Sequence, residues 1–439
     1  MIYLLFVILI VGLFCSFVLT NRNLLSCTLL GHVFYLISTS VLVLNYKEIS
    51  YDISFATVLL IEGTLICLGF GEFIGNRLVA KKNTSQVNSN NFPKIIISRS
   101  KYIICLFFIV INSFYQYFKF NYVGSVLGGG DFISKYMLVR SYLTTEDDVR
   151  GIDTIPVPYS SLFFYSNFIA TAIVYTLLFT FFYLLFFKKI RDNRLIYAVL
   201  VHIPVLVLST TRSIFINTIS ISSIIIFLVF LQSHKNRNVS GMNKKILKWS
   251  LYALILFETI FVGVGNLKEQ DVISNASSTI TSYAGASIIG LDQYIIGKVK
   301  SDSDYPGQVT LEGLVSFLNH FGFDHKLATY HQDNFYYGHS ASNIFSAPYY
   351  MLRDFPFIIV LLIHIFWGVI ISYYISKVRK FKVPQYLPYN YILVGYLYYP
   401  IVMISITDAF RHIISIPFVY TLFFLFIVQK LIIKKSIVT

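Results

Sequence analysis

The stretch VLVLSTTRSIFINTIS, residues 205–220, places a single arginine, Arg212, between two runs of apolar residues. Similar apolar runs occur from one end of the chain to the other. Of the 439 residues, 56% are hydrophobic and 13% are charged, and that charged share is about half of what an ordinary soluble domain carries. A helix of about 20 apolar residues crosses a hydrocarbon layer of roughly 30 Å. The sequence therefore predicts an all-α, polytopic integral membrane protein without a soluble catalytic domain.

Apolar runs of spanning length predict about 11 transmembrane helices. The first run lacks the basic start of a signal peptide, so we expect it to be retained. The sixth is short and contains Pro204, so we expect it to be tilted or broken. The predicted spans are 2–20, 24–45, 54–75, 101–118, 159–187, 195–208, 213–231, 249–266, 355–376, 389–407 and 413–429.

Lys and Arg are divided unequally between alternate loops. One set of loops, together with the C-terminal tail, holds 23 of the 35 basic residues, and the other set holds nearly all the acidic ones. Because basic loops remain cytoplasmic, we predict an N-terminus outside and a C-terminus in the cytoplasm. This topology accounts for the net charge of +14, so we do not expect nucleic acid as a partner.

Two predicted outer segments, 119–158 and 267–354, are much longer than a turn. Loops of more than about 15 residues are usually functional or disordered, so we expect the function to lie in them. The longer one is the single large exoplasmic loop of the predicted fold, and both belong to one membrane domain, 1–439. Within the longer segment, 267–354, we predict amphipathic helices at 279–297 and 310–323 that lie at the membrane interface.

Five arginines fall on the predicted outer side, against the positive-inside tendency. A guanidinium is a planar, always charged fork that suits phosphate oxygens, so these arginines indicate an anionic ligand such as a lipid diphosphate. The alternative is that each arginine snorkels or pairs with a nearby acid, and Arg353 and Arg411 both have an aspartate close in sequence. Arg212 has no acid within 19 residues on either side. The five are Arg140, Arg150, Arg212, Arg353 and Arg411.

Histidine can accept a proton near neutral pH. His32, His202 and His364 fall in predicted spans, where we expect packed and hydrogen-bonded side chains. Among the outer histidines, His339 and His412 are the best placed for chemistry. No spacing of His, Cys or Asp predicts a metal site. The run LGGGD lacks the Lys-Ser/Thr of a phosphate-binding loop, and we interpret it as a flexible segment.

Two stretches resemble a known family. LSTTRSIFI is similar to the small-residue, arginine turn between two spans of the bacterial oligosaccharide repeat-unit polymerases, the O-antigen polymerase type, with Arg212 at the arginine position. HSASNIFSAPYYMLRDFPFIIVLLIHIFWGVI is similar to the segment that follows the large outer loop in that family, although Pro356 replaces a glycine. His339 corresponds to a histidine of the related O-antigen ligases. The matching residues of the second stretch are Asn343, Asp354 and Phe355.

The resemblance implies glycosyl transfer without metal or cofactor at the outer face of the bacterial cytoplasmic (inner) membrane, in the synthesis of lipopolysaccharide or capsule. The implied substrates are polyprenyl-diphosphate-linked oligosaccharides, and the further partners are membrane lipid and a chain-length regulator protein. A departing diphosphate needs positive charge, and the acceptor hydroxyl needs a base. The predicted catalytic residues are His339 as the base, Arg212 and Arg353; the predicted diphosphate ligands are Arg212, Arg353, Arg411, Arg140 and His412.

Three other functions remain open. A flippase or other transporter of the same lipid-linked oligosaccharide is expected to carry charges within its spans, often in two related halves, whereas Glu62 and Glu258 are the acids we identify in predicted spans. An O-antigen ligase-type glycosyltransferase is scarcely distinguished from a polymerase by this sequence. A non-catalytic scaffold gives no reason for the arginine at position 212.

Overall fold

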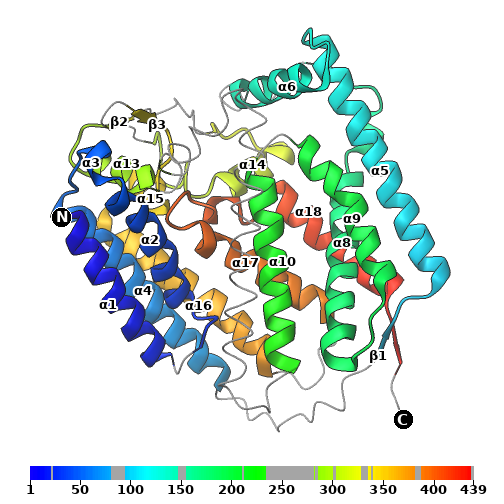
Figure 1. Cartoon of the computed structure of the whole chain (residues 1–439), viewed down its shortest axis with the longest axis horizontal. Helices are drawn as coiled ribbons and strands as arrows, with labels where there is room; N and C mark the ends of the chain where they lie inside the picture. Colours follow the sequence, from blue (N-terminus) through cyan, green and yellow to red (C-terminus); the bar gives the residue numbers. More distant parts are fainter. Residues whose placement is uncertain are drawn as a thin grey trace. The chain divides into compact units, whose positions relative to one another are not determined.

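The computed structural model is mostly helical, and its helices fall into two compact units, which are described one at a time (Figure 1). Unit 1 comprises Met1–Asn83, Ile273–Lys380 and Leu397–Ile416, and unit 2 comprises Thr84–Val272, Phe381–Tyr396 and Pro417–Thr439. The single domain 1–439 stays a prediction. The residues that the structure describes are 1–20, 23–80, 94–146, 155–209, 212–233, 281, 285–299, 303–327, 335–337, 340–380 and 387–436.

Seven helical stretches in these residues are long and apolar enough to cross a membrane, which agrees with an all-α membrane protein. Three further helices that match predicted spans are shorter. The predicted span 249–266 lies outside the described residues, so the count of 11 and the orientation stay predictions. The seven are α1 (Ile2–Leu19), α2 (Cys27–Leu44), α4 (Phe55–Ala80), α5 (Arg99–Val126), the stretch Ser160–Lys188 that contains α8 (Ser166–Tyr183), α10 (Arg212–Ser233) and α16 (Phe357–Lys380); the shorter ones are α9 (Asn193–Leu208), α17 (Leu387–Met403) and α18 (Ile416–Ile432).

The closest helix packing in unit 1 joins α4 to α16, which lie side by side although they are far apart in sequence (Figure 1). A Cβ added to Gly71 would lie 2.1 Å from the backbone oxygen of Ile365, and one added to Gly368 would lie 2.3 Å from that of Leu68. Small residues allow such backbone contact, and the van der Waals packing that results is one source of attraction between helices where no hydrophobic effect acts. On α4 they recur every fourth residue, at Gly63, Cys67, Gly71 and Gly75.

The long predicted outer segment contains α13 (Ala286–Ile295), which unit 1 buries on every side between Ala286 and Gln293. The predicted helix is confirmed, but its predicted amphipathic character is wrong, because no face of it is exposed between these residues. Its place at a membrane interface stays a prediction. Asp292 explains the burial, because its carboxylate accepts hydrogen bonds of 2.7 Å from Tyr51 Oη, the Ser54 N–H and Thr57 Oγ1. A carboxylate is favourable at a helix N-terminus, so α13 anchors the start of α4.

Further short elements follow α13 in unit 1. Helix α14 (Glu312–His320) lies within the predicted 310–323, β2 (Phe335–Tyr337) and β3 (Ser340–Ser342) pair antiparallel, and α15 (Ala347–Asp354) precedes α16. The remaining elements are α3 (Tyr46–Ile49) and the 3₁₀ turn η4 (Phe410–His412) in unit 1, and α6 (Phe132–Glu146), α7 (Ser160–Phe163), the π-helical turn η2 (Leu184–Lys188), β1 (Lys94–Ile96) and β4 (Lys434–Ser436) in unit 2.

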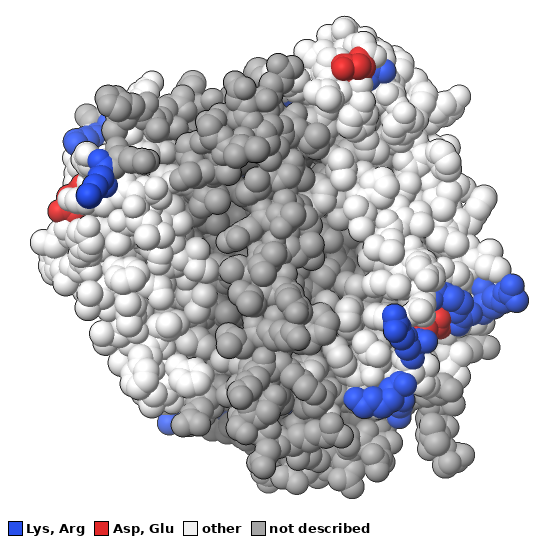
Figure 2. All heavy atoms as spheres, in the orientation of Figure 1, with Lys and Arg blue, Asp and Glu red and all other residues white. Residues whose placement is uncertain are grey.

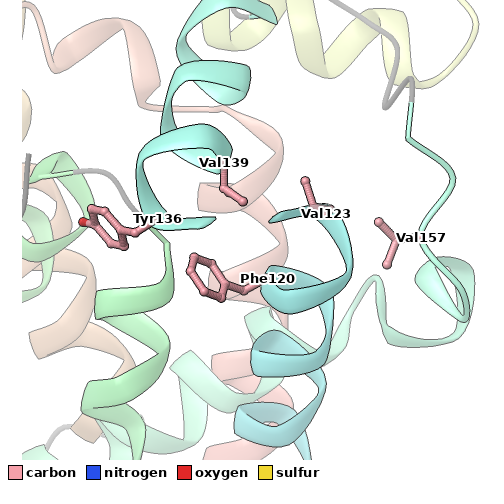
Figure 3. Packing of buried hydrophobic residues seen from close by; sticks show 5 residues of the cluster. All are labelled: Phe120, Val123, Tyr136, Val139 and Val157. Carbon is pink, nitrogen blue, oxygen red and sulfur yellow. The ribbon is translucent and has the colours of Figure 1, made fainter. Parts of the chain in front are cut away.

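In unit 2, the predicted loop 119–158 is largely a helical hairpin of α5 and α6, closed by an apolar cluster (Figure 3). The glycine run between the two helices is an ordered turn. Gly128 has a φ of +91°, which favours glycine. Asp131 caps α6, since its Oδ1 accepts from the Ser134 N–H at 2.9 Å. The cluster contains Phe120, Val123, Tyr136, Val139 and Val157.

Basic segments of unit 2 that are distant in sequence meet at one edge, where Figure 2 shows a group of Lys and Arg side chains. β1 pairs antiparallel with β4, the Nζ of Lys101 donates to the Leu431 carbonyl, and the guanidinium of Arg194 lies 5.8 Å from the centre of the Tyr102 ring. The predicted topology places all of these segments on the same side of the membrane, and their convergence within unit 2 agrees with that prediction.

Candidate functional site

The predicted site residues are divided between the two units. Arg353, Arg411 and His412 lie in unit 1, and Arg140 lies partly buried on α6 of unit 2. Arg212 is the first residue of α10, also in unit 2, so the arginine begins a helix that follows α9. Arg150 and His339 lie outside the described residues. The predicted roles of His339, Arg212 and Arg140 therefore stay predictions.

The last turn of α15 positions Arg353. This helix begins after Ser346 with a proline in its first turn, a position that tolerates the missing N–H. It ends at Asp354, because Phe355 precedes Pro356 and takes an extended conformation, as residues before proline do. A positive charge in a last turn is favourable to the helix dipole, and the side chain of Arg353 is 8% exposed.

The segment between α17 and α18 positions Arg411. Its backbone is bound on several sides, since Ser405 O accepts a 2.6 Å hydrogen bond from Ser287 Oγ on α13. The Phe410 ring stacks on Trp367 of α16 at 5.1 Å. A Cβ added to Gly313 of α14 would lie 2.4 Å from the Arg411 carbonyl oxygen, so only glycine allows α14 to approach this closely.

Tyr350 lies near both arginines, and it is a residue that the sequence analysis missed. The guanidinium of Arg411 lies 4.7 Å from the centre of the Tyr350 ring, within the range of a cation–π contact. Burial raises the pKa of Tyr350, and the positive charges of Arg411 and Arg353 oppose that rise. The two arginines, predicted separately from sequence, therefore act on one buried phenol.

Three carboxyl groups accompany the two arginines. Glu312 Oε2 lies 3.5 Å from Arg411 Nη1, with both side chains about one-sixth exposed. Asp354 accepts hydrogen bonds from the N–H groups of Val309, at 3.1 Å, and of Thr310, at 2.5 Å. The expected pairing of these arginines with nearby acids is thus partly present, but the acid that pairs with Arg411 is distant in sequence.

Asp408 is the third carboxyl group and is fully buried. Its Oδ1 accepts from the Phe410 N–H at 2.9 Å, whereas its Oδ2 has no hydrogen-bond partner among the described residues. Burial raises the pKa of Asp408 to about 7, against the opposing effect of the Arg411 charge. Near neutral pH this group therefore changes charge beside Arg411.

We call this group the arginine site. A guanidinium beside a carboxylate can exchange that partner for an anionic oxygen of a ligand. The chemistry that the site offers is recognition of an anion through planar, charged donors. Neighbouring His412 is exposed. The arginine site consists of Glu312, Tyr350, Arg353, Asp354, Asp408 and Arg411.

An apolar pocket of about 420 Å³ lies beside α15, between the starts of α4 and α16. Leu352 and Phe355, the neighbours of Arg353 and Asp354 in the chain, line it. Tyr294, which also lines the pocket, packs edge-on against Tyr349 at 5.1 Å, and the Arg353 guanidinium lies 5.9 Å from that Tyr349 ring. An apolar surface and charged donors therefore occur side by side in unit 1.

Polar side chains inside the spans of unit 1 are the second feature that sequence reasoning underestimated. Glu72 lies within α4, 4% exposed, in addition to the predicted intramembrane acid Glu62. Glu258 lies outside the described residues. His32 lies 3.4 Å from Glu62, and His364 is buried and hydrogen-bonded as expected. His202, in unit 2, is buried as expected, but its Nδ1 has no hydrogen-bond partner among the described residues.

Within the described part of the chain, no three His, Cys, Asp or Glu side chains are grouped so that they could hold a metal ion. Comparison with known proteins adds no assignment: no family model matches the chain, and neither a curated protein nor a solved structure matches it significantly. The case for a function therefore depends on the chemistry of its own residues.

Proposed function

We propose that this chain is a membrane glycosyltransferase that polymerises polyprenyl-diphosphate-linked oligosaccharide repeat units at the outer face of the bacterial cytoplasmic membrane. The observation that carries the proposal is the arginine site, in which Arg353 and Arg411 share the neighbourhood of Tyr350 beside an apolar pocket. A lipid diphosphate combines the two chemistries present there, a charged head and an isoprenoid chain. The proposal includes the orientation with the N-terminus outside.

In the proposed reaction, the acceptor hydroxyl attacks the anomeric carbon of the donor, the bond to the diphosphate breaks, and the hydroxyl proton passes to a base. Arg353 and Arg411 stabilise the negative charge that develops on the leaving diphosphate, as preorganised donors do in other transfers. Arg411 gives up its contact with Glu312 and binds the ligand instead. His339 is the proposed base, and Arg212, Arg140 and His412 are proposed further ligands of the diphosphates.

The test is the length distribution of the surface glycan in the host strain. Arg353→Ala and Arg411→Ala are each expected to remove long chains and leave single repeat units, because each lost charge-assisted hydrogen bond costs about 1.5–3 kcal/mol of stabilisation. The protein level in the membrane is measured in parallel. Long chains at an unchanged protein level would refute the diphosphate role of the substituted arginine.

A second function, transport of the same lipid-linked unit, is favoured by a specific observation, the ionisable side chains inside α2 and α4. Charged groups within spans mark transport and proton paths. Deletion of the gene separates the functions. Loss of a polymerase leaves single repeat units on the final acceptor, loss of a ligase leaves polymer on the lipid carrier, and loss of a flippase leaves units on the cytoplasmic side.

A further inference from the structure

His32 of α2 and Glu62 of α4 face each other inside unit 1. Nε2 of the histidine lies 3.4 Å from Oε1 of the glutamate, and the two side chains are 3% and 19% exposed. The other ring nitrogen, Nδ1, lies 2.8 Å from the Thr28 carbonyl oxygen one turn earlier in α2. The pair lies about 10 Å along α4 from Phe55, at 1.5 Å per residue, and so within the span.

Helix α1 covers this pair with its backbone. A Cβ added to Gly12 would lie 2.3 Å from His32 Nε2 and 2.9 Å from Glu62 Oε1, so only a glycine fits over the two groups. Ser16, one turn further along α1, places its Oγ 3.4 Å from His32 Nδ1. Three helices thus enclose one acid and one base, and their approach is fitted to those side chains.

Glu62 keeps unused hydrogen-bonding capacity. Its Oε2 is buried and has no hydrogen-bond partner among the described residues. Glu72, ten positions later on the same helix, differs, because its Oε2 accepts from Ser26 Oγ at 2.7 Å and from Thr28 Oγ1 at 3.1 Å. The Oε2 of Glu62 can therefore take up a proton without losing a hydrogen bond, whereas the Oε2 of Glu72 already accepts hydrogen bonds from two hydroxyl groups.

Other ionisable groups on the elements packed around the pair have contacts of their own. Among the described residues, the ionisable partner of His32 is therefore Glu62, and that of Glu62 is His32. Asp292 of α13 binds the first turn of α4, His364 of α16 lies 2.8 Å from the Val360 carbonyl, Arg77 of α4 lies over Phe73, Arg379 of α16 donates to Asn23, Cys27 of α2 contacts Tyr398 of α17, and Arg353 of α15 belongs to the arginine site.

We propose that His32 and Glu62 form a proton-binding site within the membrane-crossing part of unit 1, with one exchangeable proton held between Nε2 and Oε1. A net charge is costly in hydrocarbon. With one proton the pair is neutral overall, whether the proton is on nitrogen or on oxygen. Release of that proton leaves a lone carboxylate under Gly12, and a second proton leaves a lone cation, so occupancy of the site is linked to the packing of α1.

Dicyclohexylcarbodiimide, which is soluble in lipid and reacts with protonated carboxyl groups, tests the site in the full-length protein in lipid nanodiscs. Peptide mass spectrometry after labelling from about pH 5 to about pH 9 is expected to find the adduct on Glu62, with a yield that falls as the pH rises. In His32→Asn the pH dependence of this yield is expected to change, because the carboxyl group has lost the base with which it shares the proton.

Glu72 is the control in the same molecule, because Ser26 and Thr28 rather than His32 donate to its Oε2, so its labelling should not change when His32 is replaced. Glu62→Gln removes the adduct at that position, and His32→Gln repeats the test if the asparagine variant does not fold. The proposal is wrong if Glu62 is never labelled, if its yield does not vary with pH, or if neither histidine variant moves the profile. Protection by Na⁺ at constant pH would assign the site to a metal cation instead. None of these results depends on glycosyl transfer.

Discussion

Unit 1 contains two regions that are held together by opposite means. Between α4 and α16, the backbones of the two helices are in direct contact at Gly71 and Gly368, which have no side chains to separate them. At the arginine site, the charged or chargeable side chains of Arg353, Asp408 and Arg411 act on Tyr350, and backbone N–H groups bind the carboxylates of Asp354 and Asp408. The first region responds to volume and the second to charge, so each should be sensitive to a different kind of substitution.

The largest expected effect comes from breaking the helix contact with one methyl group. Gly71→Ala places a Cβ 2.1 Å from the Ile365 oxygen, and because that atom belongs to a helix backbone, it cannot move aside as a side chain would. Overpacking of this kind costs about 1–3 kcal/mol, occasionally more. We expect a clear loss of folded protein, measured by size-exclusion chromatography and thermal unfolding in detergent.

The matched control is Gly63→Ala on the same helix, whose new Cβ would lie 3.4 Å from a methyl group of Leu361. This is an ordinary contact, so the variant should unfold close to the wild-type temperature. Equal stability of the two variants would show that the backbone contact between α4 and α16 does not hold unit 1 together.

A smaller effect is expected at the arginine site when its charge is changed by pH. Asp408, with a pKa raised to about 7, is mostly neutral below that pH and mostly negative above it. Because a negative charge beside Arg411 opposes an anion, affinity for a diphosphate should fall as the pH rises through about 7, by at most about tenfold per unit for a single proton. The probe is farnesyl diphosphate, titrated by calorimetry between about pH 6 and about pH 8, one unit to either side of that value.

Asp408→Asn sharpens the same comparison, because the amide has nearly the same shape and no charge at any of these values. Its affinity should stay close to the low-pH affinity of the wild type across the range. A wild-type affinity that is constant with pH, or an asparagine variant with the same pH dependence as the wild type, would contradict the role of Asp408.

Much of the fold follows from the sequence, because apolar length alone determines where a helix can span. Helices occupy ten of the predicted spans in the described residues. The sequence did not reveal that α13 is buried, because its environment depends on the distant hydrogen bonds from Tyr51, Ser54 and Thr57 to Asp292. The spacing of glycines on α4 was a local signal of close packing that could have been read.

The candidate site was predicted in part. Residue type and the predicted side of the membrane were enough to select Arg353 and Arg411, but the nearest acid in the chain, Asp408, is only one of the carboxyl groups that act on Arg411. Its partner, Glu312, comes from α14, and the burial that changes Asp408 comes from surrounding elements. Charge pairing between distant segments depends on tertiary structure, which a single sequence does not show.

The central claim is that the arginine site binds the diphosphate of a lipid carrier, and the most direct measurement is the affinity of the purified protein in nanodiscs for farnesyl diphosphate. Arg411→Ala is expected to weaken binding about tenfold or more. Glu312→Gln, which removes the competing carboxylate, is expected to strengthen it about two- to fivefold. Wild-type affinity in Arg411→Ala, or weaker binding in Glu312→Gln, would contradict the claim and leave the pair with a structural role only.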